Sequence, residues 1–484
     1  MPKQTGKLQV RTTQRWLGKS RARTSLDVFG PSQQSRVHRI KIDTAKLLLV
    51  MTEEANSGDA HLTVYSLGPG RPMLFQLEQV STLAHVEMSN GFVVFTCGDS
   101  NVLEVWRWAQ DQEVDLVPQR PEMDQLNVYY SAMQKADFQP GSGARRGELI
   151  PMGVLRQPAD LRATRLVYPT LCVGARAGDR LWLWDIRTRQ LTQTITIEPS
   201  PFEAFGMLYV DVNETHVFVA THTVSVYSRS TGQCVFQLRD SQLEGLTHSA
   251  SYPTLQQRSH SVFLEYAWES YRELYRSSIV LTIPSDIVMA VHVSPTGDDF
   301  VAITFRGFIF HIGGLKEATA EHEMSIHEGS SDAPSPGSLG ASVSASTSSS
   351  RSPNEISLDK FRISVARGGT GLDNLAYDGN RIVADGGQGL CIINLEPQPE
   401  EIFTTSINEK QIDLYPFPAK FLNRVPPFGS EQEEYGDCTC IQITQEAIWI
   451  AWQPYLRRQQ EDLQSERKAV GMILFSEGEE EEEV

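Results

Sequence analysis

Short runs of alternating apolar and polar residues recur along most of the chain and are separated by polar turns. The clearest example is LWLWDIRTRQLTQTITI (181–197), where two such runs flank a turn. Alternation with a period of two is typical of a β-strand that buries one face. The first half of this pattern is repeated in HLTVYSLG (61–68), VLEVWRWA (102–109) and GFIFHIGG (307–314). The sequence therefore predicts an all-β fold of short antiparallel strands.

The alternating runs recur at a regular distance. When they are aligned on Trp184, a large apolar residue occupies the same position in six other runs: Tyr65, Trp106, Tyr227, Phe310, Ile393 and Phe475. Successive positions, with Trp184 included, lie 41, 78, 43, 83, 83 and 82 residues apart. These distances are close to one or two periods of about 40 to 45 residues, the length of a four-stranded propeller blade. Seven such positions predict seven blades.

The two most complete copies are WDIRTRQLTQTI and YSRSTGQCVFQL, within residues 165–240. They resemble the repeats of the WD-repeat β-propeller family, which implies a seven-bladed WD-like propeller. Only Trp184-Asp185 matches the signature dipeptide, and no Gly-His pair opens a blade. The resemblance therefore implies the architecture but not the family's Asp–His hydrogen-bond network in most blades. A β-sandwich beside a separate β domain is the alternative, because it shares the alternation and the turns.

The aligned positions are interpreted as structural residues of the repeat. We expect Trp184 to pack between blades and Asp185 to cap the turn that follows it. The residues at the position of Trp184 in other blades are Tyr65, Trp106, Tyr227, Phe310 and Phe475. If Trp184 is buried, its replacement by Ala is expected to cost about 3–5 kcal/mol of stability.

Composition divides the chain into three parts. Residues 1–35 are basic, residues 36–476 carry the repeats, and residues 477–484 form an acidic tail. The last blade lacks a fourth alternating run, because the acidic tail begins soon after GMILF. A segment before residue 36, such as KLQVRTT (7–13), can supply that strand and close the ring. Closure is favourable because it removes exposed strand edges.

Insertions explain the doubled spacings, and four are expected: 109–163, 240–283, 329–354 and 396–437. The second contains SVFLEYAWESYRELYRSS, whose apolar residues recur at i, i+3 and i+4, which predicts an amphipathic helix. The third is rich in Ser and almost free of bulky side chains, so we expect it to be disordered.

The charge and the cysteines narrow the class of protein. A formal net charge of −17 argues against general binding to nucleic acid, although residues 1–41 carry ten Lys and Arg against Asp27 alone. The sequence contains no run of about 18 apolar residues, which a membrane span would need, and no apolar segment near its start, which a secretory signal would need. Six cysteines are few for 484 residues, as in an intracellular protein with reduced thiols. The Arg-rich first 26 residues leave mitochondrial import as a minor alternative.

No catalytic, cofactor or metal motif is recognised. LGKS (17–20) lacks the upstream Gly of a phosphate-binding loop. CTC (438–440) places two thiols on one face of a strand, but no Cys or His nearby completes a zinc site. Asp211, His292 and Asp373 lie near inner-strand entries and are the candidates for a site in the central channel, although they share no pattern.

These observations favour a non-catalytic scaffold that binds protein partners in the cytoplasm or nucleus. We expect the protein to be monomeric by itself and to bind neither nucleic acid nor membrane. The first alternative is a substrate-recognition subunit of a ubiquitin ligase, because the chain resembles the propeller part of fungal F-box proteins with WD repeats. That resemblance implies ligase subunits as partners, yet no F-box pattern occurs in the first 45 residues. The second alternative is a propeller hydrolase or lyase, since propellers also host enzymes.

Overall fold

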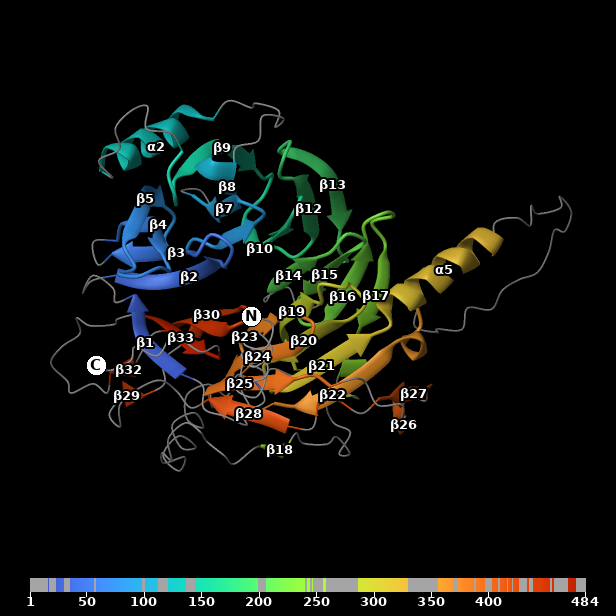
Figure 1. Ribbon diagram of the computed structural model, residues 1–484. Helices are drawn as coiled ribbons and strands as arrows, with labels where there is room; N and C mark the ends of the chain where they lie inside the picture. The colour runs from blue at the N-terminus through green and yellow to red at the C-terminus, as the bar shows by residue number, and fades with distance from the viewer. Residues whose placement is uncertain are drawn as a thin grey trace, which may run out of the picture.

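Seven of the eight sheets in the described part of the computed structural model surround a common centre, so the chain is a seven-bladed β-propeller (Figure 1). This confirms the predicted fold. The sheets are antiparallel in their four-stranded cores. The structure describes residues 16, 23–29, 35–55, 58–97, 101–111, 121–135, 144–198, 206–239, 242–243, 246, 256–257, 286–329, 356–368, 372–386, 389–396, 403–407, 410–415, 417–419, 421–425, 433–434, 438–452, 455–456 and 469–475.

Blades 1 to 4 are consecutive along the chain. Blade 1 consists of β2 Ser35–Asp43, β3 Leu48–Ala55, β4 Ala60–Ser66 and β5 Met73–Val80, and blade 2 of β6 Val86–Ser89, β7 Phe92–Thr96, β8 Val102–Trp108 and β9 Leu149–Arg156. Blade 3 consists of β10 Leu161–Val167, β11 Thr170–Ala175, β12 Arg180–Asp185 and β13 Gln190–Thr196, and blade 4 of β14 Tyr209–Val212, β15 His216–Ala220, β16 Val224–Ser228 and β17 Cys234–Leu238.

Blades 5 to 7 have longer connections. The core of blade 5 consists of β19 Val288–Val293, β20 Phe300–Thr304, β21 Phe308–Gly313 and β22 Arg362–Arg367. That of blade 6 consists of β23 Asn374–Tyr377, β24 Arg381–Gly386, β25 Gly389–Asn394 and β28 Phe421–Val425, and that of blade 7 of β30 Cys438–Ile443, β31 Ala447–Trp452, β33 Ala469–Leu474 and β1 Arg23–Phe29. Additional strands are β26 Phe403–Ile407 and β27 Lys410–Leu414 beside β22, β18 Gln256–Gln257 beside β28, and the pair β29 Glu433–Glu434 and β32 Tyr455–Leu456.

The outer strand of the last blade comes from the beginning of the chain. β1 pairs antiparallel with β33, with Arg23 opposite Leu474 and Phe29 opposite Val470. The strand thereby joins the two ends of the sequence in one sheet, as ring closure requires. The segment that the sequence offers for this place, residues 7–13, lies outside the described residues.

The hydrophobic core is divided among the interfaces between blades. Each repeat residue lies on the third strand of its blade, or directly after it, and belongs to the cluster shared with the preceding blade; these residues are Tyr65, Trp106, Trp184, Tyr227, Phe310, Ile393 and Phe475. In blades 1 to 4 the register between the third and fourth strands shifts immediately before this residue. The extra residue at such a bulge increases the local twist of the strand.

Trp184 is less buried than a core position would be. Its ring is partly exposed, and its Nε1 donates a hydrogen bond to Gln157 Oε1 at 3.2 Å. Trp182, two residues earlier on the same face of β12, is 2% exposed and fills the interface with blade 2. Asp185 accepts a hydrogen bond from the backbone N–H of Arg187 at 2.9 Å, so its carboxylate caps the turn.

Two predicted insertions are shorter than the sequence suggested. After the 3₁₀ turn η1 (Ala109–Asp111) and helix α2 (Met123–Lys135), the range 109–163 contains β9 and the start of β10. The range 396–437 contains β26, β27 and β28. Both ranges include the fourth strand of a blade, because the chain leaves the sheet after the third strand and later returns to it.

Helix α5 (Leu315–Gly329) leads out of blade 5 toward the Ser-rich segment and projects from the ring (Figure 1). A second 3₁₀ turn, η2 (Leu358–Lys360), precedes β22. Residues 330–354 lie outside the described residues, as do most of 240–283, where the amphipathic helix was expected.

Candidate functional site

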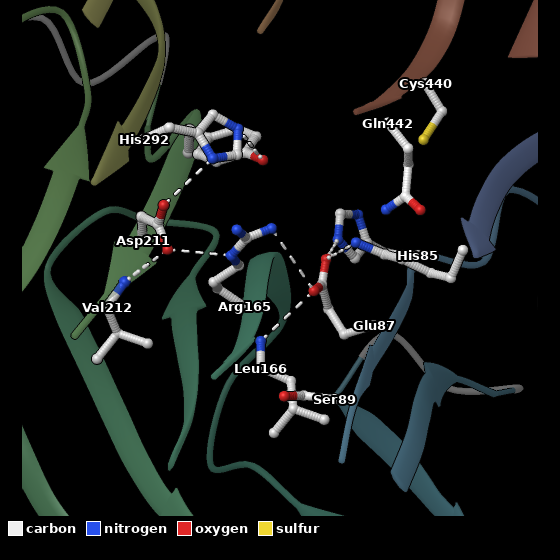
Figure 2. Close-up of polar contacts among 12 residues, drawn as sticks. His85, Glu87, Ser89, Arg165, Leu166, Asp211, Val212, His292, Cys440 and Gln442 are labelled. Carbon is white, nitrogen blue, oxygen red and sulfur yellow. Dashed lines mark hydrogen bonds and ion pairs between the residues drawn. The ribbon is translucent and has the colours of Figure 1, made fainter. Parts of the chain in front are cut away.

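A chain of ionisable side chains follows the innermost strands of five successive blades. The residues alternate in type, one from each of β2, β6, β10, β14 and β19: Lys41, Glu87, Arg165, Asp211 and His292. Figure 2 shows the last four of them. Lys41 Nζ lies 3.0 Å from Glu87 Oε1, Arg165 Nη1 lies 3.9 Å from Glu87 Oε2, and Arg165 Nε lies 3.0 Å from Asp211 Oδ1. His292 Nδ1 lies 3.2 Å from Asp211 Oδ2. We call this set the inner charge chain.

Glu87 is the first carboxylate of the inner charge chain. Its side chain is 4% exposed, and the ring of His85 donates to Oε1 at 2.9 Å (Figure 2). Burial would raise the pKa of Glu87, but Lys41, His85 and Arg165 together hold it well below its usual range. Burial lowers the pKa of His85, so this ring is neutral near pH 7. Glu87 therefore carries a buried charge that its cationic neighbours compensate.

Asp211 is the second carboxylate and is more deeply enclosed, with a side chain 1% exposed. Besides Arg165 and His292, it accepts from the backbone N–H of Val212 at 2.8 Å (Figure 2) and from that of Val293 at 3.1 Å. Burial opposes ionisation, but these contacts lower the pKa of Asp211. The pKa of Arg165 is raised, because Asp211 and Glu87 outweigh the cost of its burial.

Side chains of the inner strands also reach the backbone of the next blade. Ser89 Oγ accepts from the N–H of Tyr168 at 3.2 Å, and Gln442 Oε1 accepts from the N–H of Ile42 at 2.9 Å. The second contact joins blade 7 to blade 1 across the closure of the ring. Such bonds satisfy backbone groups that the sheets leave unpaired at their inner edges.

The inner charge chain contains one arrangement that resembles a proton relay. Tyr209 Oη lies 2.9 Å from His292 Nε2, and His292 Nδ1 contacts Asp211. Burial lowers the pKa of His292 despite the nearby carboxylate, so the neutral ring donates from Nδ1 to Asp211 and accepts from Tyr209. Both ring nitrogens are then occupied, and burial raises the pKa of Tyr209 above its usual value. The geometry fits a structural network that holds blades 4 and 5 together.

The three candidates for a channel site have different surroundings. Asp211 and His292 are in contact, as described above. Asp373 lies in blade 6, where its N–H donates to the carbonyl of Asp385 at 3.0 Å.

Within the described ranges, no group of His, Cys, Asp and Glu is arranged to hold a metal ion. Cys438 and Cys440 are buried, and both are free thiols.

A recess of about 820 Å³ lies between blades 3 and 4 and the start of α5. We call it the α5 groove. Its walls come from β13, the turn between β14 and β15, the end of β16 and the first turns of α5, and they include Gln193, Glu214, His216, Arg229, Lys316 and Thr319. In an antiparallel blade these connections lie at the same end of the strands, so the α5 groove belongs to one face of the propeller.

The α5 groove combines fixed and available polar groups. The Arg229 guanidinium is held by the carbonyls of Asn213 at 2.6 Å and Glu214 at 3.1 Å. His216 is buried, and burial lowers its pKa to about 4, so it is neutral near pH 7. The backbone N–H of Lys316 donates to Asp298 Oδ1, which caps α5, and its side chain is exposed. Lys316 therefore offers a cation to whatever enters the recess.

Sequence reasoning missed Lys41, Glu87 and Arg165. For Glu87 the available signal is a charged residue in a short inner run, VEMS. Arg165 in LRATRLV and Lys41 in SRVHRIKID stand among other charged or polar residues, so the local pattern does not single them out. No helix among the described residues is long and apolar enough to cross a membrane.

Comparison with known proteins adds only distant likenesses between structures. No family model matches the chain, and no curated protein matches it. A solved structure described as "Structure of U3-55K" is similar, with 7% sequence identity over 94% of this chain and 98% of that chain and a TM-score of 0.46. A likeness of this degree carries no conclusion about function.

Proposed function

We propose that this protein is a non-catalytic intracellular scaffold that binds a protein partner through the α5 groove. The observation that carries the proposal is the groove itself, a recess on one face of the ring whose walls carry charged and polar residues and which is flanked by a helix that projects beyond it. Propellers present rigid faces of this kind, on which loops and insertions supply the contacts.

The inner charge chain supports a scaffold over an enzyme. Its carboxylates and the His292 ring are paired with one another, with Tyr209 and with backbone N–H groups. A catalytic acid or base needs a group within hydrogen-bond reach of a substrate. A network whose members are already paired instead stabilises the ring around its centre.

The test is a capture experiment with matched charge reversals. Tagged full-length chain, wild type or Lys316→Glu, is isolated from its native cells, and the bound proteins are quantified by mass spectrometry. The control is Arg176→Glu, an exposed residue in the turn between β11 and β12, which lies at the opposite face. We expect Lys316→Glu to lose a partner that wild type and Arg176→Glu retain. Equal recovery of every partner by all three chains would refute the groove as the binding surface.

The same experiment examines the narrower alternative of a ubiquitin-ligase receptor. Ligase subunits among the proteins retained by Arg176→Glu would favour that alternative. Their absence, with another partner retained, would leave the general scaffold as the proposed function.

A further inference from the structure

Trp16 occupies a pocket between blades 6 and 7. Its indole ring is 5% exposed and stacks on Phe475, with ring centroids 3.6 Å apart and an interplanar angle of 11°. The guanidinium carbon of Arg381 lies 3.9 Å from the centroid of the same ring. A tryptophan ring is the best partner for a guanidinium cation among aromatic side chains.

The pocket also recognises the polar groups of this residue. Trp16 Nε1 donates to the carbonyl of Gln445 at 3.3 Å, and the Trp16 carbonyl accepts from Asn394 Nδ2 at 2.7 Å. Asn394 ends β25 and Gln445 lies in the turn between β30 and β31, so two blades contribute. These contacts bind both the indole ring of Trp16 and its main-chain carbonyl.

The propeller itself fixes the walls of the pocket. Arg381 Nε donates to Asp378 Oδ2 at 2.7 Å, and Arg381 Nη2 donates to the carbonyl of Thr444 at 3.3 Å. Both contacts are made within the propeller, and neither involves Trp16. The two hydrogen-bonding partners of Trp16 lie 429 and 378 positions away in the sequence, so the pocket and its occupant belong to separate parts of the chain.

We infer that this pocket, formed by Phe475, Arg381, Asn394 and Gln445, is a binding site for a tryptophan-anchored peptide segment. Trp16 of the same chain is its intramolecular ligand, seven residues before the closing strand β1. Tryptophan is enriched among the residues that dominate binding at interfaces, and its N–H usually finds a partner when buried. The site is distinct from the α5 groove and does not depend on the proposed function.

Tethering determines when the site is available. A ligand on a short linker has an effective concentration on the order of millimolar, so a free peptide competes poorly with Trp16 in the intact chain. Removal of the Trp16 ring frees the pocket for a tryptophan supplied from another molecule. The supplier is either a separate peptide or the beginning of a second copy of this chain.

The experiment uses the full-length Trp16→Ala chain and a fluorescent peptide of residues 11–21, with binding followed by anisotropy. We expect saturable binding to this chain, and at least about tenfold weaker binding to wild type, whose pocket is filled. The control peptide carries Trp16→Ala and is expected not to bind. Adding Asn394→Ala to the Trp16→Ala chain removes the donor to the main-chain carbonyl and should weaken binding by several-fold. Trp16→Leu replaces Trp16→Ala if the latter does not fold.

Two results would overturn the inference. One is equal binding of the two peptides, which would mean that the indole is not recognised. The other is equal binding of the tryptophan peptide to wild-type and Trp16→Ala chains, which would place its site elsewhere. Sedimentation of the Trp16→Ala chain mixed with an Asn394→Ala chain then identifies the supplier. A heterodimer assigns it to a second copy, whereas monomers that still bind the peptide assign it to a separate peptide.

Discussion

At the residue scale, Asp211 shows how the centre of the ring is stabilised. Its carboxylate contacts the Arg165 guanidinium, the His292 ring and two backbone N–H groups, and its side chain is 1% exposed. A buried charge is tolerated only when such partners compensate the loss of hydration. Loss of this one side chain would leave Arg165 without its closest anion.

Asp211→Ala should therefore destabilise the protein by about 3–5 kcal/mol, the usual cost of removing one partner of a buried ion pair. The measurement is the free energy of unfolding from urea denaturation at neutral pH. Glu122→Ala is the matched control, because Glu122 pairs with Arg156 at 2.6 Å but both side chains are largely exposed. The control should cost less than about 1 kcal/mol. Similar costs for the two variants would show that the inner charge chain does not stabilise the fold.

His216 makes stability depend on pH. Burial lowers its pKa from 6.5 to about 4, so the unfolded chain binds a proton more readily than the folded chain. Stability is then fully present above pH ~6.5 and is lost as pH falls toward ~4. Between pH 7 and pH 5 this group alone should remove about 2 kcal/mol. In His216→Gln the loss of unfolding free energy over this range should be smaller by that amount, whereas an unchanged loss would contradict the assignment.

At the element scale, the third strands were predictable and the fourth strands often were not. Trp106, Tyr227 and Phe310 mark third strands because each follows the same alternation at a regular distance. β9, with Pro151 and Gly153 inside it, departs from the strand pattern and follows a helical excursion. Periodicity is a local signal and cannot show where a chain that has left a sheet returns to it.

The inner charge chain was unpredictable for a similar reason. Glu87 and Arg165 stand 78 residues apart, and only the ring places β6 beside β10. Asp211 and His292 were named as candidates because both are polar residues in inner strands. Their mutual contact depends on the packing of blade 4 against blade 5.

Burial on β12 reverses the expected importance of its two tryptophans. Trp182→Ala should cost about 3–5 kcal/mol, since its ring is 2% exposed between blades 2 and 3. Trp184→Ala should cost about half as much, because this ring is partly exposed and loses mainly its hydrogen bond to Gln157. Unfolding free energies of the two variants, measured under the same conditions, decide the order. A larger cost at Trp184 would contradict the packing described for this blade.

At the scale of the whole molecule, closure joins the two ends of the sequence. β1 completes blade 7, Trp16 fills the neighbouring junction with blade 6, and Gln442 bonds to the backbone of blade 1. A closed ring of rigid blades keeps the α5 groove in a fixed shape, which reduces the ordering cost of binding a partner.

The central claim is that a protein partner occupies the α5 groove, and site-specific photocrosslinking in native cells tests it most directly. A photoreactive amino acid is placed at Gln193 in the groove or at Arg176 on the opposite face, in otherwise wild-type chains. The account predicts one crosslinked protein from Gln193 that Arg176 does not give. Crosslinks from Arg176 alone, or the same products from both positions, would contradict it.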